Sequence, residues 1–209
     1  MIRLRVRIRF CKEGDLRWIS HRDLMRTFER LFRRAGCVLA MSQGYHPHPR
    51  MSFPLALSVG IRGAEEVMEV QLAEQVDSAD LVRRLAAHAP PGLLFTGASV
   101  LQDGQPKARV EYVQYEIPVP SDRHAPLSNA IEQLMSKPSY PVERAGHKGP
   151  LDLLANLQEL RLTDGRLRMR MQIIATRSAG PRDLLQALGM SDLEGEGHTL
   201  VRTAVEIAS

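Results

Sequence analysis

The sequence predicts an α+β fold made of two successive modules, and three observations support this prediction. The first residues alternate strictly between arginine and apolar side chains, as in a half-buried strand. A capped amphipathic helix is expected directly after them. Beyond a turn-rich stretch at 102–106, the order of strands and helices begins again. The chain of 209 residues has room for two modules of about 100 residues each.

The opening strand is the clearest element. Its apolar side chains fall on one face, namely Ile2, Leu4, Val6, Ile8 and Phe10. Its arginines fall on the other face, namely Arg3, Arg5, Arg7 and Arg9. Because side chains alternate across a strand, we expect the apolar face to pack on helices and the arginines to project from the opposite side of the sheet.

A helix with a basic face follows the opening strand. Ser20 suits its N-cap, Asp23 completes a capping box, and Gly36 suits the turn that ends it after Ala35. One face carries an apolar stripe of Leu24, Phe28, Leu31, Phe32 and Ala35. Another face carries Arg22, Arg26, Arg30 and Arg33, with Arg34 beside them. No acid lies four residues after the first three of these arginines, so pairing within the helix does not explain their spacing.

The remaining segments repeat one order in both halves. Extended segments of the first half are expected at 38–41, 51–61, 66–72 and 93–101, with a helix at 77–88. Those of the second half are expected at 109–119, 140–144, 159–163, 166–175 and 199–207, with helices at 124–136 and 181–188. Strand, helix, strand, strand, helix, strand is the ferredoxin-like order. We therefore expect two tandem ferredoxin-like (βαββαβ) modules with antiparallel sheets, at 1–102 and 107–209.

Positive charge is concentrated near the N-terminus. Residues 1–50 hold twelve Lys/Arg against four Asp/Glu, whereas the remainder holds sixteen against twenty. This asymmetry favours an acidic partner for the N-terminal half, and nucleic acid is the usual one. The alternative is a solvated basic surface without a ligand.

The composition argues against several classes of protein. No apolar run approaches the roughly 20 residues of a membrane span, and the arginine-rich start is not a signal peptide. Cys11 and Cys37 are too few for a disulfide scaffold, so a cytoplasmic protein with buried, reduced cysteines is expected. The sequence has no C-x-x-C pair, zinc-binding spacing or glycine-rich phosphate loop, so neither a metal nor a cofactor is expected. Trp18 is expected to anchor the core, and the alternative is a platform on which a base stacks.

The arginines of the opening strand and of the basic helix are candidate RNA-binding residues. Guanidinium groups about 7 Å apart on one strand face repel one another, and they need phosphates, carboxylates or solvent as partners. The alternative partners are acids on other strands, such as Glu66, Glu69, Glu111 and Glu116. The strand shows no aromatic residue among its arginines, so contacts with the phosphate backbone are expected more than base recognition.

Three histidines mark a candidate site. His21 lies at the expected start of the helix, where backbone amides favour anions, and His46 and His48 alternate with prolines in a loop. The same candidate site includes Ser20, Tyr45 and Arg50. Three interpretations stay open: a hydrogen-bonded network that fixes the loop, contact with a substrate or partner, and metal binding or RNA cleavage by histidine.

Two stretches resemble a known family. The first reads Lys12-x-Gly14-Asp15-Leu16-Arg17-x-Ile19-Ser20-His21-x-Asp23-Leu24, continued by Phe28-Glu29-Arg30 and Arg33-Arg34-Ala35-Gly36. The second reads Ser42-x-Gly44-Tyr45-His46-Pro47-His48-Pro49, continued by Leu55-x-Leu57-x-Val59-Gly60. With these motifs the chain resembles the radical-SAM-linked protein family. Asp152-Leu153 and Val201-Arg202-Thr203 also fit, so the resemblance covers nearly the whole chain. The chain departs from that family at Tyr45-His46, where Phe and Asn are more usual.

The resemblance implies an accessory protein that is fused to, or works beside, a radical SAM enzyme. Its expected role is non-catalytic: it would bind RNA or present substrate to that enzyme in RNA modification. One alternative is an endoribonuclease in which His21 is catalytic, because CRISPR repeat-processing enzymes also pair ferredoxin-like modules. A second alternative is an adaptor whose basic face binds an acidic protein.

Overall fold

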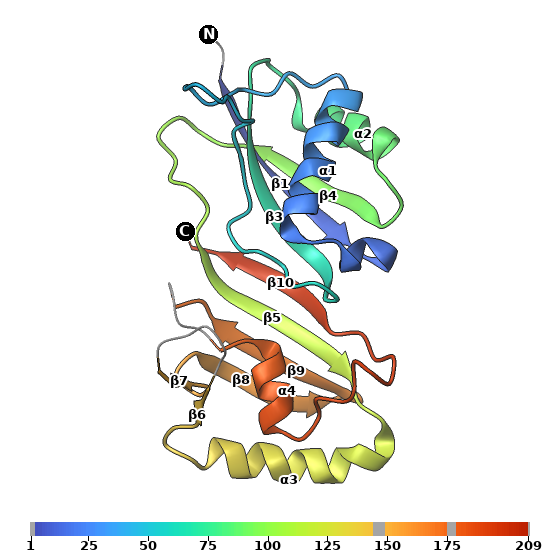
Figure 1. Ribbon diagram of the computed structural model, residues 1–209, viewed down its shortest axis with the longest axis vertical. Coiled ribbons are helices and arrows are strands. Elements are labelled where there is room, and N and C mark those ends of the chain that lie inside the picture. The colour runs from blue at the N-terminus through green and yellow to red at the C-terminus, as the bar shows by residue number, and fades with distance from the viewer. Residues whose placement is uncertain (1–2, 144–148, 175–178, 209) are drawn as a thin grey trace. The chain divides into compact units, whose positions relative to one another are not determined.

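The computed structural model describes residues 3–143, 149–174 and 179–208, and the chain divides into two compact units (Figure 1). The first unit ends at Arg109 and the second begins at Val110. Both units combine helices with an antiparallel sheet, so the α+β prediction is confirmed. The expected linker at 102–106 lies a few residues before the observed division and belongs to the first unit.

The first unit has the expected order of strands and helices. Its elements are β1 (Leu4–Lys12), α1 (His21–Arg34), β2 (Met51–Ser52), β3 (Arg62–Leu72), α2 (Ser78–His88) and β4 (Leu93–Val100). A short 3-10 turn, η1 (Gly14–Trp18), separates β1 from α1. The strands pair antiparallel in the order β4-β1-β3-β2.

The alternation of β1 sets up the core of this unit. Val6, Ile8 and Phe10 are at most 1% exposed, and they belong to one cluster with the apolar stripe of α1 and with Leu81 and Leu85 of α2. Full burial of side chains of this size contributes roughly 1.5–3 kcal/mol each. The helices therefore cover one face of the sheet, and the arginines of β1 project from the other, as the pattern predicts.

Both ends of α1 follow from the local sequence. The Ser20 hydroxyl accepts a hydrogen bond from the Asp23 backbone amide at 3.2 Å, which confirms the predicted N-cap. Gly36 has a φ of +67°, a conformation that disfavours residues with a side chain. The amides of Gly36 and Cys37 then bond the carbonyls of Arg33 and Phe32, so a Schellman turn ends the helix.

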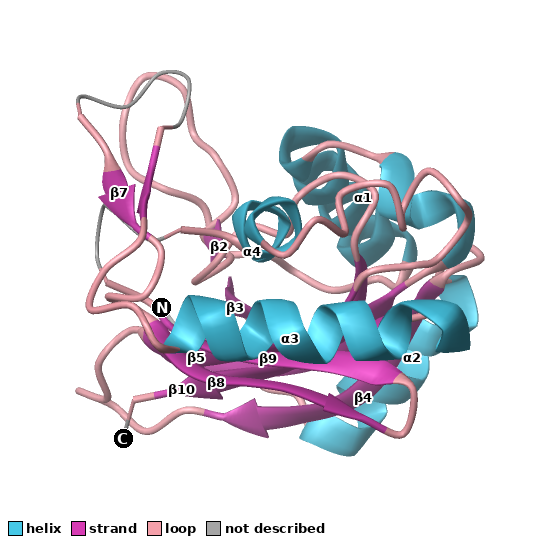
Figure 2. Cartoon of the chain, turned by 90° about the horizontal axis from the view of Figure 1, so that it is seen from below, coloured by secondary structure: helices cyan, strands magenta, loops and turns pink. Residues whose placement is uncertain are grey.

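The second unit repeats the order with one additional hairpin. Its elements are β5 (Val110–Pro118), a 3-10 turn η2 (Ser121–Arg123), α3 (His124–Met135), β6 (Pro141–Val142), β7 (Leu151–Asp152), β8 (Leu157–Thr163), β9 (Arg166–Gln172), α4 (Pro181–Ala187) and β10 (Val201–Ile207). The strands of its main sheet run in the order β10-β5-β9-β8, and β6 pairs with β7. Figure 2 shows α3 running across one face of these strands.

Two expected strands are much shorter than predicted. The segment at 38–41 makes only isolated bridges, at Leu39 and Met41, and the strand expected at 51–61 is reduced to β2. Prolines explain much of this difference, because Pro49 and Pro54 flank β2 and cannot donate to a strand ladder. The ends of the strands expected at 140–144 and 166–175 lie outside the described residues. No helix in the described part of the chain is long and apolar enough to cross a membrane.

Candidate functional site

The arginines of β1 are largely engaged by acids of the first unit. Glu69 of β3 lies opposite Arg7 in the strand register and is only 5% exposed. One of its carboxylate oxygens accepts from Arg7 at 2.9 and 3.1 Å and from the Ala108 amide at 3.1 Å, and the other accepts from Arg5 at 3.1 Å. We call these four residues the Glu69 cluster. The cluster gives Arg5 and Arg7 a structural role.

The other two arginines of the opening strand are more accessible; together with Arg5 and Arg7 we call them the arginine ladder. Arg9 lies 3.5 Å from Glu65 in an exposed ion pair, and Arg3 is exposed. Acid pairing, one of the two interpretations of the ladder, therefore holds for three of its four arginines. Glu66, another of the acids expected as partners, pairs in register with Phe10 and is buried. Contact of the ladder with RNA stays a prediction.

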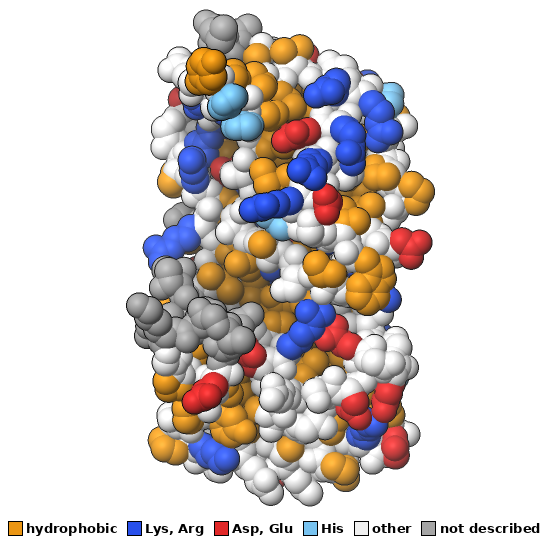
Figure 3. Space-filling view, viewed as in Figure 1, with side chains coloured by type: hydrophobic (Ala, Val, Ile, Leu, Met, Phe, Trp, Pro, Cys, Tyr) orange, Lys and Arg blue, Asp and Glu red, His pale blue; other side chains and the backbone are white. Residues whose placement is uncertain are grey.

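The arginines of α1 have a different environment. Arg22, Arg26, Arg30, Arg33 and Arg34 are all exposed, and we call them the α1 basic face. Arg26 lies 3.5 Å from Asp23, and Arg34 donates to the carbonyl of His88. Within the described residues, Arg22, Arg30 and Arg33 have no ion-pair partner. Figure 3 shows basic side chains gathered over this helix, so the α1 basic face is open to an anionic ligand.

His21 contacts the core of the first unit. It is the first residue of α1, and its ring packs edge-on against Phe53 at a centroid distance of 5.4 Å. Phe53 in turn contacts Phe10 and Phe28 at 6.0 and 5.4 Å, so His21 borders an aromatic cluster. This contact assigns the ring a packing role.

The loop Ser42–His48, here called the Tyr45 loop, is closed by its own hydrogen bonds. The Ser42 amide donates to the His48 carbonyl at 2.7 Å, and the His48 amide donates to the Ser42 hydroxyl at 2.9 Å. Tyr45 is 95% exposed, and its ring contacts that of His46 at 5.0 Å. The loop thus presents an aromatic side chain to solvent.

The six residues of the predicted site do not form one network. Ser20 caps α1, His21 packs on Phe53, and Tyr45 contacts His46. No group of three His, Cys, Asp or Glu side chains suited to a metal ion is found in the described part of the chain. The arrangement therefore favours the interpretation of the Tyr45 loop as a contact surface.

The prediction that Trp18 anchors the core is wrong. Its side chain is 58% exposed, and the Arg17 guanidinium carbon lies 4.7 Å from the centre of its ring. The turn η1 has no buried residue, and Leu16 and Ile19 pack against the core from either side of Trp18. Phe10 of β1 and Phe28 of α1 contact each other within that core, whereas the indole lies at the surface as a further exposed aromatic group.

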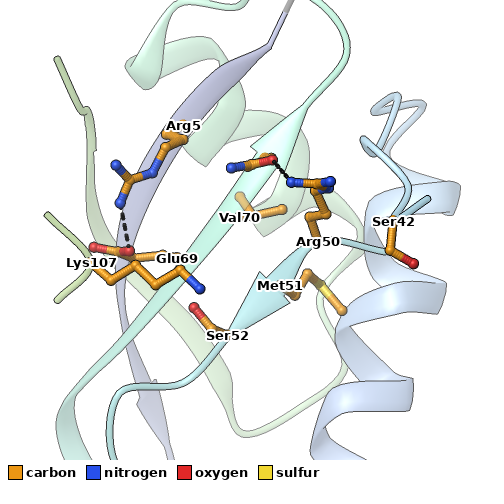
Figure 4. Close-up of a pocket in the computed structure, with 9 residues that line it drawn as sticks. Arg5, Ser42, Arg50, Met51, Ser52, Glu69, Val70 and Lys107 are labelled. Carbon is orange, nitrogen blue, oxygen red and sulfur yellow. Dashed lines mark hydrogen bonds and ion pairs between the residues drawn. The ribbon is translucent and has the colours of Figure 1, made fainter. Parts of the chain in front are cut away.

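Sequence reasoning missed a basic pocket on the first unit. The cavity has a volume of about 240 Å³ and is lined by Arg5, Ser42, Arg50, Met51, Ser52, Glu69, Val70, Gln71 and Lys107 (Figure 4). Its residues come from β1, the Tyr45 loop, β2 with the preceding Arg50, β3 and the segment before Arg109. The sequence offered one weak signal, the lone Lys107 directly after the turn-rich stretch at 102–106, and only the fold places this residue across the pocket from Arg50.

The cysteines have no feature of a reactive nucleophile. Burial raises the pKa of the Cys37 thiol, and it likewise raises the pKa of the Cys11 thiol, with Glu13 adding to the effect. Because the thiolate is the reactive form, both residues are disfavoured as nucleophiles at neutral pH. The Cys11 sulfur also lies 2.8 Å from the Ala64 carbonyl oxygen, which it can reach as a donor.

These features define an α+β protein whose first unit carries a basic helix face, an exposed aromatic loop and a basic pocket. The chain belongs to the family described as "Uncharacterized protein conserved in bacteria (DUF2344)", whose model matches residues 5–183. No curated protein matches the chain.

Two solved structures are similar to the chain at low identity. One is an unknown protein from Galdieria sulphuraria, 12% identical over 100% of both chains, with a TM-score of 0.28. The other is a putative glycine cleavage system transcriptional repressor, 7% identical over 100% of this chain and 99% of that chain, with a TM-score of 0.26. At these TM-scores neither similarity carries an argument about fold or function.

Proposed function

We propose that this protein is a non-catalytic accessory protein that binds RNA through the α1 basic face and the Tyr45 loop. The observation that carries the proposal is the set of five exposed arginines on one helix, of which only Arg26 has an acidic partner among the described residues. Arginine remains charged at any relevant pH and binds phosphate through two parallel hydrogen bonds. A row of such groups suits a polyphosphate backbone.

Charge and exposed rings add support. The first unit holds seventeen Lys/Arg against eleven Asp/Glu, whereas the second holds eleven against thirteen. Tyr45 and Trp18 offer faces on which unpaired bases can stack, and single-stranded RNA is commonly bound in this way. The strand orders of the two units favour tandem ferredoxin-like modules, an architecture that leaves the outer side of a helix free for a ligand.

The partner in this proposal is a radical SAM enzyme, to which the protein would present RNA for modification. The support is the resemblance of the motifs around Ser20-His21 and Tyr45-His46 to the radical-SAM-linked family. Two free cysteines are compatible with work in the reducing cytoplasm. Co-purification of the enzyme after nuclease treatment would support this part of the proposal, and its absence with and without RNA would reject it.

Salt-dependent titration of a labelled structured RNA tests the RNA-binding role. The triple variant Arg26→Ala, Arg30→Ala, Arg33→Ala should bind more weakly at every salt concentration. The slope of log K against log salt should become smaller by about 2, since each single-strand phosphate contact contributes about 0.7. The control is Arg83→Ala, Arg161→Ala, Arg166→Ala, which removes three other charges, two of them more than half exposed.

The outcomes of the titration separate the proposal from its alternatives. Equal loss in the two triple variants would show that net charge alone matters, and it would reject the α1 basic face as the site. RNA cleavage that His21→Ala abolishes would indicate an endoribonuclease. If the unaltered protein binds no RNA, the result would favour the alternative that the protein is an adaptor whose α1 basic face binds an acidic protein.

A further inference from the structure

The basic pocket has the composition of an anion-binding site. Arg5, Arg50 and Lys107 supply three positive charges, and Ser42, Ser52 and Gln71 supply neutral polar groups. Among the described residues of the lining, Glu69 is the one acid, and its carboxylate already accepts from two arginines and a backbone amide. The pocket therefore keeps a surplus of positive charge.

Arg50 and Lys107 carry that surplus. Arg50 donates only to neutral groups, namely the Met41 carbonyl at 3.3 Å and the Gln71 amide oxygen at 3.5 Å. Neither Arg50 nor Lys107 forms an ion pair with any residue that the structure describes. Figure 4 shows them on opposite sides of the pocket, with the Lys107 amine pointing inward. Two cations held across a polar cavity favour an anion between them.

The backbone around both cations is fixed before any ligand arrives. Arg5 donates to the carbonyls of Gln105 and Pro106, and the Ala108 amide donates to Glu69, so hydrogen bonds hold the chain on each side of Lys107. The Arg50 amide donates to the Ala40 carbonyl, and its carbonyl accepts from the Gln71 amide. A site assembled in this way loses little conformational entropy on binding.

The size of the cavity narrows the class of ligand. At about 240 Å³ it lies below the range of about 300–1,000 Å³ that is usual for sites of drug-sized ligands. A whole nucleotide or cofactor would extend beyond it, whereas a single phosphate group would not. We propose that the pocket binds the phosphate group of a phosphate monoester, with Arg50 and Lys107 as its charged ligands and Ser42 and Ser52 as hydroxyl donors.

The test is calorimetric titration of the full chain with inorganic phosphate and with a nucleoside 5′-monophosphate. Lys107→Gln and Arg50→Gln should each weaken binding about 10- to 100-fold, because a hydrogen bond to a charged group contributes about 1.5–3 kcal/mol. Arg83→Gln is the control, since it removes one exposed charge of the same unit outside the pocket. Lys107 is exposed, so its substitution leaves the fold intact even if Arg50→Gln disturbs the Tyr45 loop.

Absence of phosphate binding by the unaltered protein would overturn the inference, and so would equal binding by Lys107→Gln. A comparison of 5′-phosphorylated with 5′-hydroxyl RNA then identifies the source of the phosphate. Preference for the 5′-phosphorylated RNA that Lys107→Gln removes would assign the pocket to an RNA end, and no preference would assign it to a small monoester. The inference is independent of RNA binding by the α1 basic face, because the α1 triple variant leaves the pocket unchanged.

Discussion

The arginines of β1 and those of α1 are equally regular in the sequence, yet their surroundings differ. On β1, Arg5 and Arg7 converge on the buried carboxylate of Glu69. On α1, Arg22, Arg30 and Arg33 have no acidic partner in the described part of the chain. The difference comes from β3, which places an acid opposite β1, whereas the arginines of α1 lie on the exposed side of that helix. Spacing therefore predicts where cations lie, and the neighbouring element decides whether they are available.

Among the variants that test this difference between β1 and α1, Glu69→Ala is expected to change the free energy of unfolding most. Removing the carboxylate leaves Arg5 and Arg7, each about one-fifth exposed, without their shared partner. We expect the free energy of unfolding to fall by about 3 kcal/mol, at the lower end for a broken buried ion pair because both arginines retain some solvent. Urea denaturation measures this loss.

A matched control for this variant is available on the same strand. Glu65→Ala removes an exposed partner from Arg9, and it should change the free energy of unfolding by less than about 0.5 kcal/mol. Similar losses in the two variants would contradict the distinction between a structural and an accessible arginine on β1.

Tyr45→Ala should affect binding and leave stability unchanged. The side chain is 95% exposed, so it contributes little to the folded state. Stacking of one base contributes about 1–3 kcal/mol, so RNA affinity should fall about 10-fold in a filter-binding assay. Tyr45→Phe keeps the ring and should retain affinity. A stable Tyr45→Ala variant with full affinity would limit the RNA site to the α1 basic face.

The second unit contains an ion pair between Arg170 and Glu206 that is more exposed than those of Glu69, so its contribution to stability is expected to be smaller. Arg170 donates to Glu206 at 2.6 Å, and this bond, with a second from Gln114, lowers the pKa of Glu206. A carboxyl whose folded pKa is lowered stabilises the protein above its unfolded pKa and loses that contribution as the pH falls through the folded pKa. Both side chains are about one-third exposed, so solvent screening keeps the effect small.

Acid titration of the unfolding free energy tests this pair. Stability should decline as the pH falls into the range in which glutamate normally titrates and further down to the lowered pKa of Glu206, and Glu206→Gln should make that decline shallower. A profile unchanged by the substitution would contradict the pairing.

The smallest effect is expected for the stability of the α1 variants. Arg26→Ala, Arg30→Ala and Arg33→Ala should each change the free energy of unfolding by less than about 0.5 kcal/mol, because all three side chains are exposed and the pair of Arg26 with Asp23 is a surface ion pair. Thermal unfolding measures this. A large loss in any of them would mean that the α1 basic face is part of the folded framework and not a free surface.

Much of the fold could be predicted from the sequence because its signals are local. The alternation of β1, the Ser20 cap and the Gly36 turn all follow from residues within a few positions. The position of Trp18 could not be predicted, because the adjacent apolar residues Leu16, Trp18 and Ile19 do not show which of their side chains the fold packs against the core. The basic pocket could not be predicted either, since Arg50 and Lys107 are 57 residues apart in numbering and meet only through the fold.

The Glu69 cluster has a practical consequence for producing the first unit alone. One carboxylate fastens the opening strand, through Arg5 and Arg7, to the residues just before the boundary, through the amide of Ala108. A fragment that ends with β4 would retain every helix and strand of this unit, but it would lose the hydrogen bond from the Ala108 amide to Glu69. A fragment that ends at Arg109 keeps this hydrogen bond, so a fragment of the first unit should extend several residues beyond β4.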